Sequence, residues 1–231
     1  MTTFGRATKL GCVVAVLAAW AVGPSLVQAA DDMEKVELKL PKPAFIGTPK
    51  NPPPGLVVEP PRKGPREPLM APKGTVNLAA KRPVTASDKE PIIGTLEQVT
   101  DGDKEASDGS WVELGPGLQW VQIDLGQPSN IYGFLVWHHH GDPRVYKDVV
   151  VQVADDEDFI TNVKTVFNND TDNSSGLGIG KEMMYFENFE GKLIPVKDGV
   201  KGRYVRLYSK GNTSDDQNHY TEIEVFGVPA K

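Results

Sequence analysis

Short runs of alternating apolar and polar residues fill most of the chain after residue 75. They are rich in β-branched and aromatic residues, and clusters of Gly, Asn, Asp and Pro separate them. Such alternation is typical of half-buried strands, and no segment keeps helical periodicity beyond a turn or two. We therefore predict an all-β sandwich or jelly roll. Its expected strands are WVQIDL, IYGFLVW, VYKDVVVQV, VKTVF, RYVRLYS and YTEIEVFG.

The chain begins with a different pattern, in which Arg6 and Lys9 precede an apolar run over residues 10–22. A transmembrane anchor is the alternative to a signal peptide here, but a span needs about 20 apolar residues and this run is shorter. The pattern therefore predicts a secretory signal peptide over residues 1–29, with cleavage after Ala29 or, alternatively, Ala30. We expect export to the periplasm, the extracellular space or the cell surface, with no membrane span after cleavage.

Removal of this segment changes the chemistry available to the protein. Cys12 is the one cysteine, and the apolar run follows it, which is the wrong order for an acylated lipoprotein cysteine. The mature chain would therefore have no disulfide, thiol catalysis or cysteine-bound zinc. Without Arg6 and Lys9 it has 23 basic and 31 acidic side chains, a formal charge of −8. This charge argues against nucleic acid as a partner.

Residues 30–74 are proline-rich, with eleven of the chain's nineteen prolines between Pro41 and Pro72. Proline removes backbone donors, and the segment has few apolar residues to bury. We expect a disordered, extended linker that acts as a spacer at the N-terminal side of the folded domain. A recognition motif for a proline-binding partner remains the alternative. The folded domain is then predicted over residues 75–231, a length that suits a single core.

The stretch SSGLGIGK looks at first like a phosphate-binding loop. A P-loop needs glycine at its first position and Ser or Thr after the lysine, but Ser175 and Glu182 occupy those places. We interpret the stretch as a flexible glycine loop.

The stretch TDGDKEASDGSW is richer in oxygen ligands. Counted from Asp101, an EF-hand needs Gly and Glu where the chain has Ala106 and Val112. Asp101 and Asp103 flank a glycine that lets the chain turn. Two interpretations stay open: a calcium site of another geometry, or a solvated acidic turn.

Several segments, taken in order, resemble one known family. They are NLAAKRPVTAS, VTDGD, QWVQIDLG, IYGFLVWH, RYVRLYS and EIEVFG. Together they resemble the discoidin or coagulation-factor C-type domain, and the related galactose-binding-like modules of carbohydrate-binding family 32. The resemblance spans nearly the whole folded region. It implies an eight-stranded jelly roll with ligand loops at one end, and often a structural calcium ion near the chain termini.

The resemblance also implies which residues would bind calcium. The family often has threonine five residues after the first aspartate, where this chain has Ala106, so Ser107 or a backbone carbonyl would have to substitute. A hard cation takes six to eight oxygens. The expected ligands are the side chains of Asp101, Asp103 and Glu222 and the backbone carbonyls of Gln98 and Thr221.

Three consecutive histidines stand in WHHHGDPRVY, at the end of a predicted strand. Alternation would put His138 and His140 on the face of Tyr132, Phe134 and Val136, and His139 on the other face. A transition metal held by His138 and His140 would need further ligands, which only His219 or loop carboxylates could supply. Two histidines on one face supply only two of the four ligands that a transition-metal site needs.

In the family that the chain resembles, the loop after this strand lines the ligand-binding end. Arginine offers a fixed fork of donors, and imidazole both donates and accepts. Trp137 could stack on a ligand, but its place inside the apolar run favours the core. The predicted ligand-binding residues are His139, His140, Arg144, Asn169 and His219.

No Ser-His-Asp context or nucleophile elbow is recognisable, and no cysteine survives processing. We therefore predict a secreted, non-catalytic binding module. The family resemblance implies calcium as its cofactor and carbohydrate or a cell-surface glycan as its ligand. The alternative is an adhesion or structural module of the cell envelope that binds a protein partner, because fold alone does not decide function.

Overall fold

The computed structural model describes residues 1–3, 33–49 and 51–230. The predicted signal peptide lies outside the described residues, except for residues 1–3. The described part is almost entirely β, and no helix in it is long and apolar enough to cross a membrane. Its elements are β1 (Met33–Lys35), β2 (Met70–Pro72), β3 (Val76–Asn77), β4 (Val84–Ala86), the 3-10 helix η1 (Leu96–Thr100), β5 (Val112–Leu114), β6 (Gln119–Trp137), β7 (Val150–Ala154), β8 (Lys164–Asn168), β9 (Lys192–Ser209), β10 (Asn218–Tyr220) and β11 (Glu222–Pro229).

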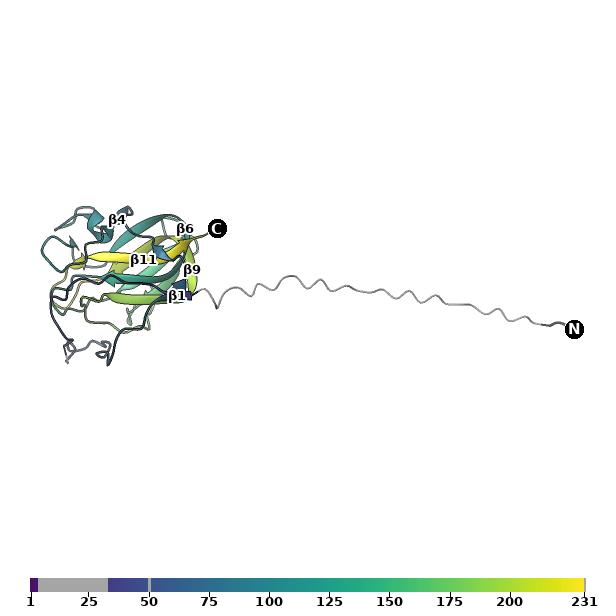
Figure 1. Ribbon diagram of the computed structural model, residues 1–231, viewed down its shortest axis with the longest axis horizontal. Coiled ribbons are helices and arrows are strands. Elements are labelled where there is room, and N and C mark those ends of the chain that lie inside the picture. Colours follow the sequence, from purple (N-terminus) through teal and green to yellow (C-terminus); the bar gives the residue numbers. More distant parts are fainter. Residues whose placement is uncertain (4–32, 50, 231) are drawn as a thin grey trace. The chain divides into compact units, whose positions relative to one another are not determined.

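Two long strands, β6 and β9, organise the main antiparallel sheet (Figure 1). The order across this sheet is β3-β11-β6-β9-β7-β8, and β4 pairs with the first part of β6. Two smaller antiparallel pairs, β5 with β10 and β1 with β2, complete the strands. The predicted all-β sandwich is confirmed.

The main core lies on one face of these strands, as alternation requires. Val121, Ile123 and Leu125 of β6 are fully buried in it, together with apolar residues of β7, β9 and β11. An irregularity between Ile131 and Gly133 shifts the alternation of β6. Ile131 consequently faces the core in place of Tyr132, so the prediction that Tyr132 shares a face with Phe134 is wrong. A bulge adds one residue and reverses the faces beyond it.

The opposite face of β6 and β11 buries a second apolar cluster, made of Leu69, Leu135, Trp137 and Phe226. Val36 and Leu38 pack against it from the segment of residues 33–49 and 51–72, which we call the N-terminal arm. Leu69 approaches the sheet so closely that a side chain at Gly133 would lie 2.8 Å from it. Trp137 is thus a buried residue, as favoured from the sequence, although it lies in this second cluster.

The disordered linker expected over residues 30–74 is not confirmed where the arm is described. β1 and β2 of the arm pair with one another, and Arg66 donates to the carbonyl of Glu190 at 2.6 Å. The arm also forms a bridge between Val58 and Met184. The prolines suit this role because an extended chain without backbone donors can cross a surface with few partners. Its few apolar residues pack on the sheet, and Leu69 is buried there.

Candidate ligand-binding site

The histidine segment begins where β6 ends, and its first member is a core residue. His138 is fully buried, and its ring stacks on Tyr146 with 4.3 Å between ring centroids. Its Nδ1 lies 2.7 Å from Oε1 of Glu187, which is also buried. His138 therefore orders the interior beneath the loop and does not reach a ligand.

Arg144 lies at the centre of a polar cluster at this end of the sandwich. Its guanidinium forms a two-point contact with Asp142, from Nε to Oδ1 at 2.6 Å and from Nη2 to Oδ2 at 3.0 Å. Nη1 lies 3.2 Å from Oδ2 of Asp215, in the loop before β10. Burial alone would lower the pKa of Arg144, but these carboxylates raise it above its ordinary value. The fork is permanently charged and fixed in direction.

His219 joins the cluster from β10. Its Nδ1 is 2.9 Å from the Tyr146 hydroxyl, and its Nε2 is 3.3 Å from Oε2 of Glu113 on β5. Burial lowers the pKa of His219 to about 4, although Asp215 opposes the shift. A neutral imidazole satisfies both neighbours in one tautomer, because Tyr146 donates to Nδ1 and Nε2–H donates to Glu113. Burial also raises the pKa of Glu113, with Asp215 adding to the effect.

His139 completes the cluster and is half-buried. Its ring meets Trp111 edge to face with 4.3 Å between centroids, and it lies 6.0 Å from the His219 ring. Burial, followed by the charge of Arg144, lowers the pKa of His139. Gly141 lets the ring pack closely, since a Cβ there would come within 2.9 Å of Nε2 of His139 and the ring would have to shift.

Three of the five predicted ligand-binding residues thus come together: His139, Arg144 and His219. His140 does not join them, because it is fully buried and its Nε2 bonds the carbonyl of Lys104 at 2.9 Å. Asn169 is also fully buried, and its side-chain oxygen accepts from the Val149 amide. His140 and Asn169 are therefore not members of the Arg144 cluster.

Sequence reasoning missed four members of the cluster: Trp111, Glu113, Asp142 and Asp215. Asp142 could have been found, since a carboxylate two residues before an arginine in a turn is within reach of it. The other three come from strands and loops distant in sequence, and no local pattern marks them. The completed cluster offers fixed donors, fixed acceptors and one aromatic ring, the set of groups that fits hydroxyl-rich ligands.

The residues expected to bind calcium lie elsewhere, around η1 and the start of β11. Oε2 of Glu222 accepts from the Gly102 amide at 3.1 Å, which brings Glu222 to the turn between Asp101 and Asp103. Glu222 is almost fully buried, and this burial raises the pKa of its carboxyl to about 9, with Glu224 and Asp101 adding to the shift. A buried carboxylate next to another carboxylate is a donor set that a hard cation suits.

Asp103 and the remaining predicted ligands are less well placed. Both carboxylate oxygens of Asp103 accept hydrogen bonds, from the Glu105 amide and the Ser110 hydroxyl. The Gln98 side chain accepts from the Thr95 amide and donates to the carbonyl of Gly109, and the Thr221 hydroxyl donates to the carbonyl of His138. For Gln98 and Thr221, the resemblance assigns the backbone carbonyls, not the side chains, as calcium ligands. Asp101 and Glu222 accept from the Asp103 and Gly102 amides respectively, through one oxygen each, whereas both oxygens of Asp103 accept.

The fold is a β-sandwich with a polar cluster among the loops at one end. Comparison with known proteins identifies its family. The model of the F5/8 type C domain matches residues 83–224. The chain belongs to this family, as its sequence resemblance suggested. No curated protein matches the chain.

Solved structures give the same fold at low identity. A family 89 glycoside hydrolase from Clostridium perfringens, in complex with 2-acetamido-1,2-dideoxynojirmycin, is 20% identical with a TM-score of 0.50, over 67% of this chain and 15% of the hydrolase. CBM32 of AlyQ, in complex with 4,5-unsaturated mannuronic acid, is 21% identical with a TM-score of 0.43, over 62% of this chain and 93% of the module. A fucose binding module from Streptococcus pneumoniae is 17% identical with a TM-score of 0.46, over 65% and 96%.

Proposed function

We propose that the protein is an exported, non-catalytic module that binds carbohydrate at the cluster of Arg144, His139, His219 and Glu113. One observation supports this most: two carboxylates, Asp142 and Asp215, fix the Arg144 fork beside two neutral imidazoles. Sugars have many hydroxyls and apolar C–H faces. A rigid set of donors and acceptors next to the Trp111 ring recognises them at low entropic cost.

The same geometry favours binding over hydrolysis. Most glycosidases need a pair of free carboxyl groups on opposite sides of the scissile bond. Asp142 and Asp215 both bond Arg144, and hydrogen bonding to Arg144 holds the pKa of Asp142 below its ordinary value. Glu113 is the cluster carboxyl whose pKa is raised, because burial disfavours its charged form.

A glycan array probed with the full mature chain tests the proposal. We expect binding to a restricted group of neutral glycans. A blank across the array would overturn carbohydrate binding and favour the protein-partner alternative. Turnover of a chromogenic glycoside that is lost in Glu113→Gln would show an enzyme instead.

We also propose that calcium binds at Asp101 and Glu222, with the carbonyls of Gln98 and Thr221 as further ligands. The bound ion would supply a positive charge to a buried acidic turn and stabilise the native state by mass action. At about 100 times the dissociation constant this amounts to about 2.7 kcal/mol.

The calcium proposal predicts a melting temperature that depends on the ion. Chelator should lower the melting temperature of the purified chain by about 5 °C or more, and added calcium should restore it. Glu222→Gln keeps the shape of the side chain but cannot ionise to bind the cation, so the response should be lost. Asp198→Asn, on the exposed part of β9, is the control. Equal melting curves in chelator and calcium would contradict the site.

The low pKa of His219 predicts a loss of stability in acid. Between pH 6.5 and about 4 the unfolded chain protonates this histidine while the folded chain does not, so stability is present above pH 6.5 and falls as the pH drops. The loss should reach on the order of 3 kcal/mol near pH 4. Urea unfolding at pH 7 and pH 4 measures it. His219→Gln should flatten the dependence, and an unchanged pH slope in this variant would refute the assignment.

A further inference from the structure

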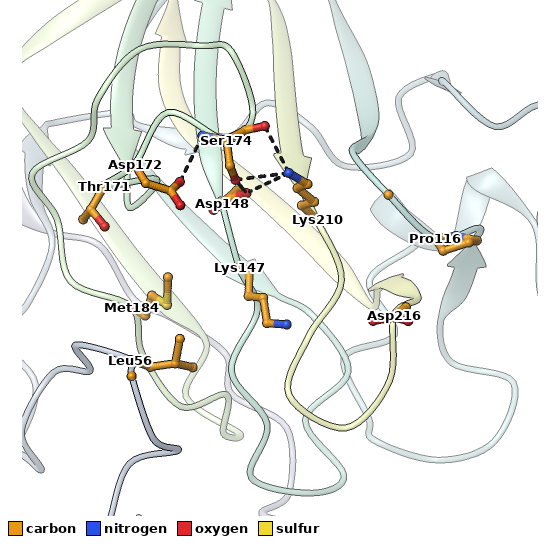
Figure 2. A pocket seen from close by; sticks show the side chains of 12 residues that line it. Leu56, Pro116, Lys147, Asp148, Thr171, Asp172, Ser174, Met184, Lys210 and Asp216 are labelled. Carbon is orange, nitrogen blue, oxygen red and sulfur yellow. Dashed lines mark hydrogen bonds and ion pairs between the residues drawn. The ribbon is translucent and has the colours of Figure 1, made fainter.

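A cleft lies between the N-terminal arm and the loops around Lys147 and Ser174 (Figure 2). Its volume is about 510 Å³, and a second cavity of about 510 Å³ adjoins it, because Leu56, Lys147 and Asp216 line both. Each volume lies in the range of roughly 300–1,000 Å³ that is typical of small-molecule sites. The walls come from the arm and from the loops that follow β5, Tyr146, β8 and β9.

Asp215 connects this cleft to the proposed sugar site. Its carboxylate bonds Arg144 and its residue also lines the second cavity. Lys147 follows Tyr146, whose hydroxyl bonds His219. The cleft therefore begins where the Arg144 cluster ends.

The cleft presents charged groups that the protein leaves available. Figure 2 shows Lys147 extending into the cavity, with Leu56 and Met184 on one side and Asp216 and Pro116 on the other. In the part of the chain that the structure describes, no ion pair involves Lys147 or Asp216. A lysine ammonium has three donors and a carboxylate accepts four hydrogen bonds, so ligand hydroxyls would find both kinds of partner.

The opposite wall is held in place by a network around Ser174. Lys210 Nζ lies 3.0 Å from the Ser174 carbonyl and 3.9 Å from the carboxylate of Asp148 (Figure 2). The Ser174 amide bonds Asp172 at 3.0 Å. Counting Lys147 and Lys210 against Asp148, Asp172 and Asp216, the lining has a formal charge of −1. This balance disfavours an anionic ligand.

The N-terminal arm supplies the apolar part of the cleft. Leu56 lies opposite Lys147 and beside Met184, and backbone bonds from Met184 to Val57 and from Glu59 to Met184 hold the arm there, at 3.2 and 2.8 Å. An aliphatic wall facing hydrogen-bonding groups suits the two-faced surface of a sugar ring.

We infer that the cleft is an extended subsite, so that the protein binds a neutral oligosaccharide of several units and the arm forms part of its binding surface. This inference rests on the proposed sugar site at Arg144. One sugar contacts the Arg144 cluster, and the following units lie along Lys147, Asp216 and Leu56.

Chain-length dependence of affinity tests the inference. Isothermal titration of the full mature chain would use cellulose, mannan, galactan and chitin oligosaccharides of one to four units, with the oligogalacturonate series as the anionic comparison. For the neutral series that binds, the tetramer should bind at least about tenfold more tightly than the monomer. One additional hydrogen bond to a charged group is enough to give this gain in affinity. Lys147→Ala and Leu56→Ala should each reduce this ratio.

Matched controls separate the subsite from general damage. Lys201→Ala, exposed on β9, and Ile46→Ala, exposed on the arm outside the cleft, should keep the wild-type ratio. Monomer and tetramer that bind equally well would overturn the extended subsite while leaving sugar binding intact. Tighter binding of the oligogalacturonates would overturn the preference for a neutral chain. If no series binds, the proposed function itself fails and the subsite with it.

Discussion

Arg144→Ala is expected to abolish sugar binding, lowering affinity by about 100-fold or more. A hydrogen bond to a charged group contributes roughly 1.5–3 kcal/mol, and the guanidinium keeps N–H groups on Nη1 and Nη2 beyond those that bond Asp142 and Asp215. The variant also leaves three carboxyl groups, those of Asp142, Asp215 and Glu113, without the positive charge between them. Their mutual repulsion would move them from the positions in which they could bond ligand hydroxyls. Titration of the glycan selected on the array measures the loss.

Arg144→Lys should give an intermediate result. Lysine keeps the positive charge between the two aspartates but presents one ammonium in place of a planar fork. We expect the thermal stability to stay near the wild-type value and the affinity to drop by about tenfold or more, since geometry is lost and charge is not. Affinity equal to wild type in Arg144→Lys would mean that charge alone matters at this position.

Removal of the arm, in a chain of residues 73–231, is expected to destabilise the domain by roughly 5 kcal/mol or more. The arm covers Leu135, Trp137 and Phe226, which would become exposed on the outer face of the sheet, and each such side chain contributes roughly 1.5–3 kcal/mol when buried. The melting temperature should fall by roughly 10 °C or more.

A single substitution tests the same contact without truncation. Leu69→Ala should cost about 2–5 kcal/mol, because the leucine is buried against Gly133 and Trp137. Ile46→Ala, on the same arm but 95% exposed, should change little. Urea unfolding measures both. A shortened chain as stable as the full one would return the arm to the role of a linker.

The strand pattern could be predicted from the sequence because each strand contributes its own alternation to the core. Val121, Ile123 and Leu125 follow the period of two without exception. The irregularity before Gly133 could not be predicted, since two-residue periodicity carries no signal of an inserted residue. The packing of the arm was not predicted for a related reason. It depends on few apolar residues, Val36, Leu38 and Leu69, in a composition dominated by proline.

The site was predictable in its location and only partly in its members. Residues close in sequence, such as His139 and Arg144, could be assigned to one loop end. The partners Glu113 and Asp215 arrive through the pairing of β5 with β10 and through a distant loop, contacts that tertiary packing creates. Residue type alone does not locate the three histidines. His138 and His140 are fully buried, whereas His139 between them belongs to the cluster.

The most direct test of sugar binding at Arg144 is a paired titration of Arg144→Ala and Arg203→Ala with the glycan that the wild type selects. Arg203 makes an equivalent two-point contact, with Asp124 at 2.7 Å for both bonds, but in the sheet away from the cluster. We predict that Arg144→Ala loses binding while Arg203→Ala binds as the wild type does. Retained binding in Arg144→Ala, or an equal loss of binding in both variants, would contradict sugar binding at Arg144.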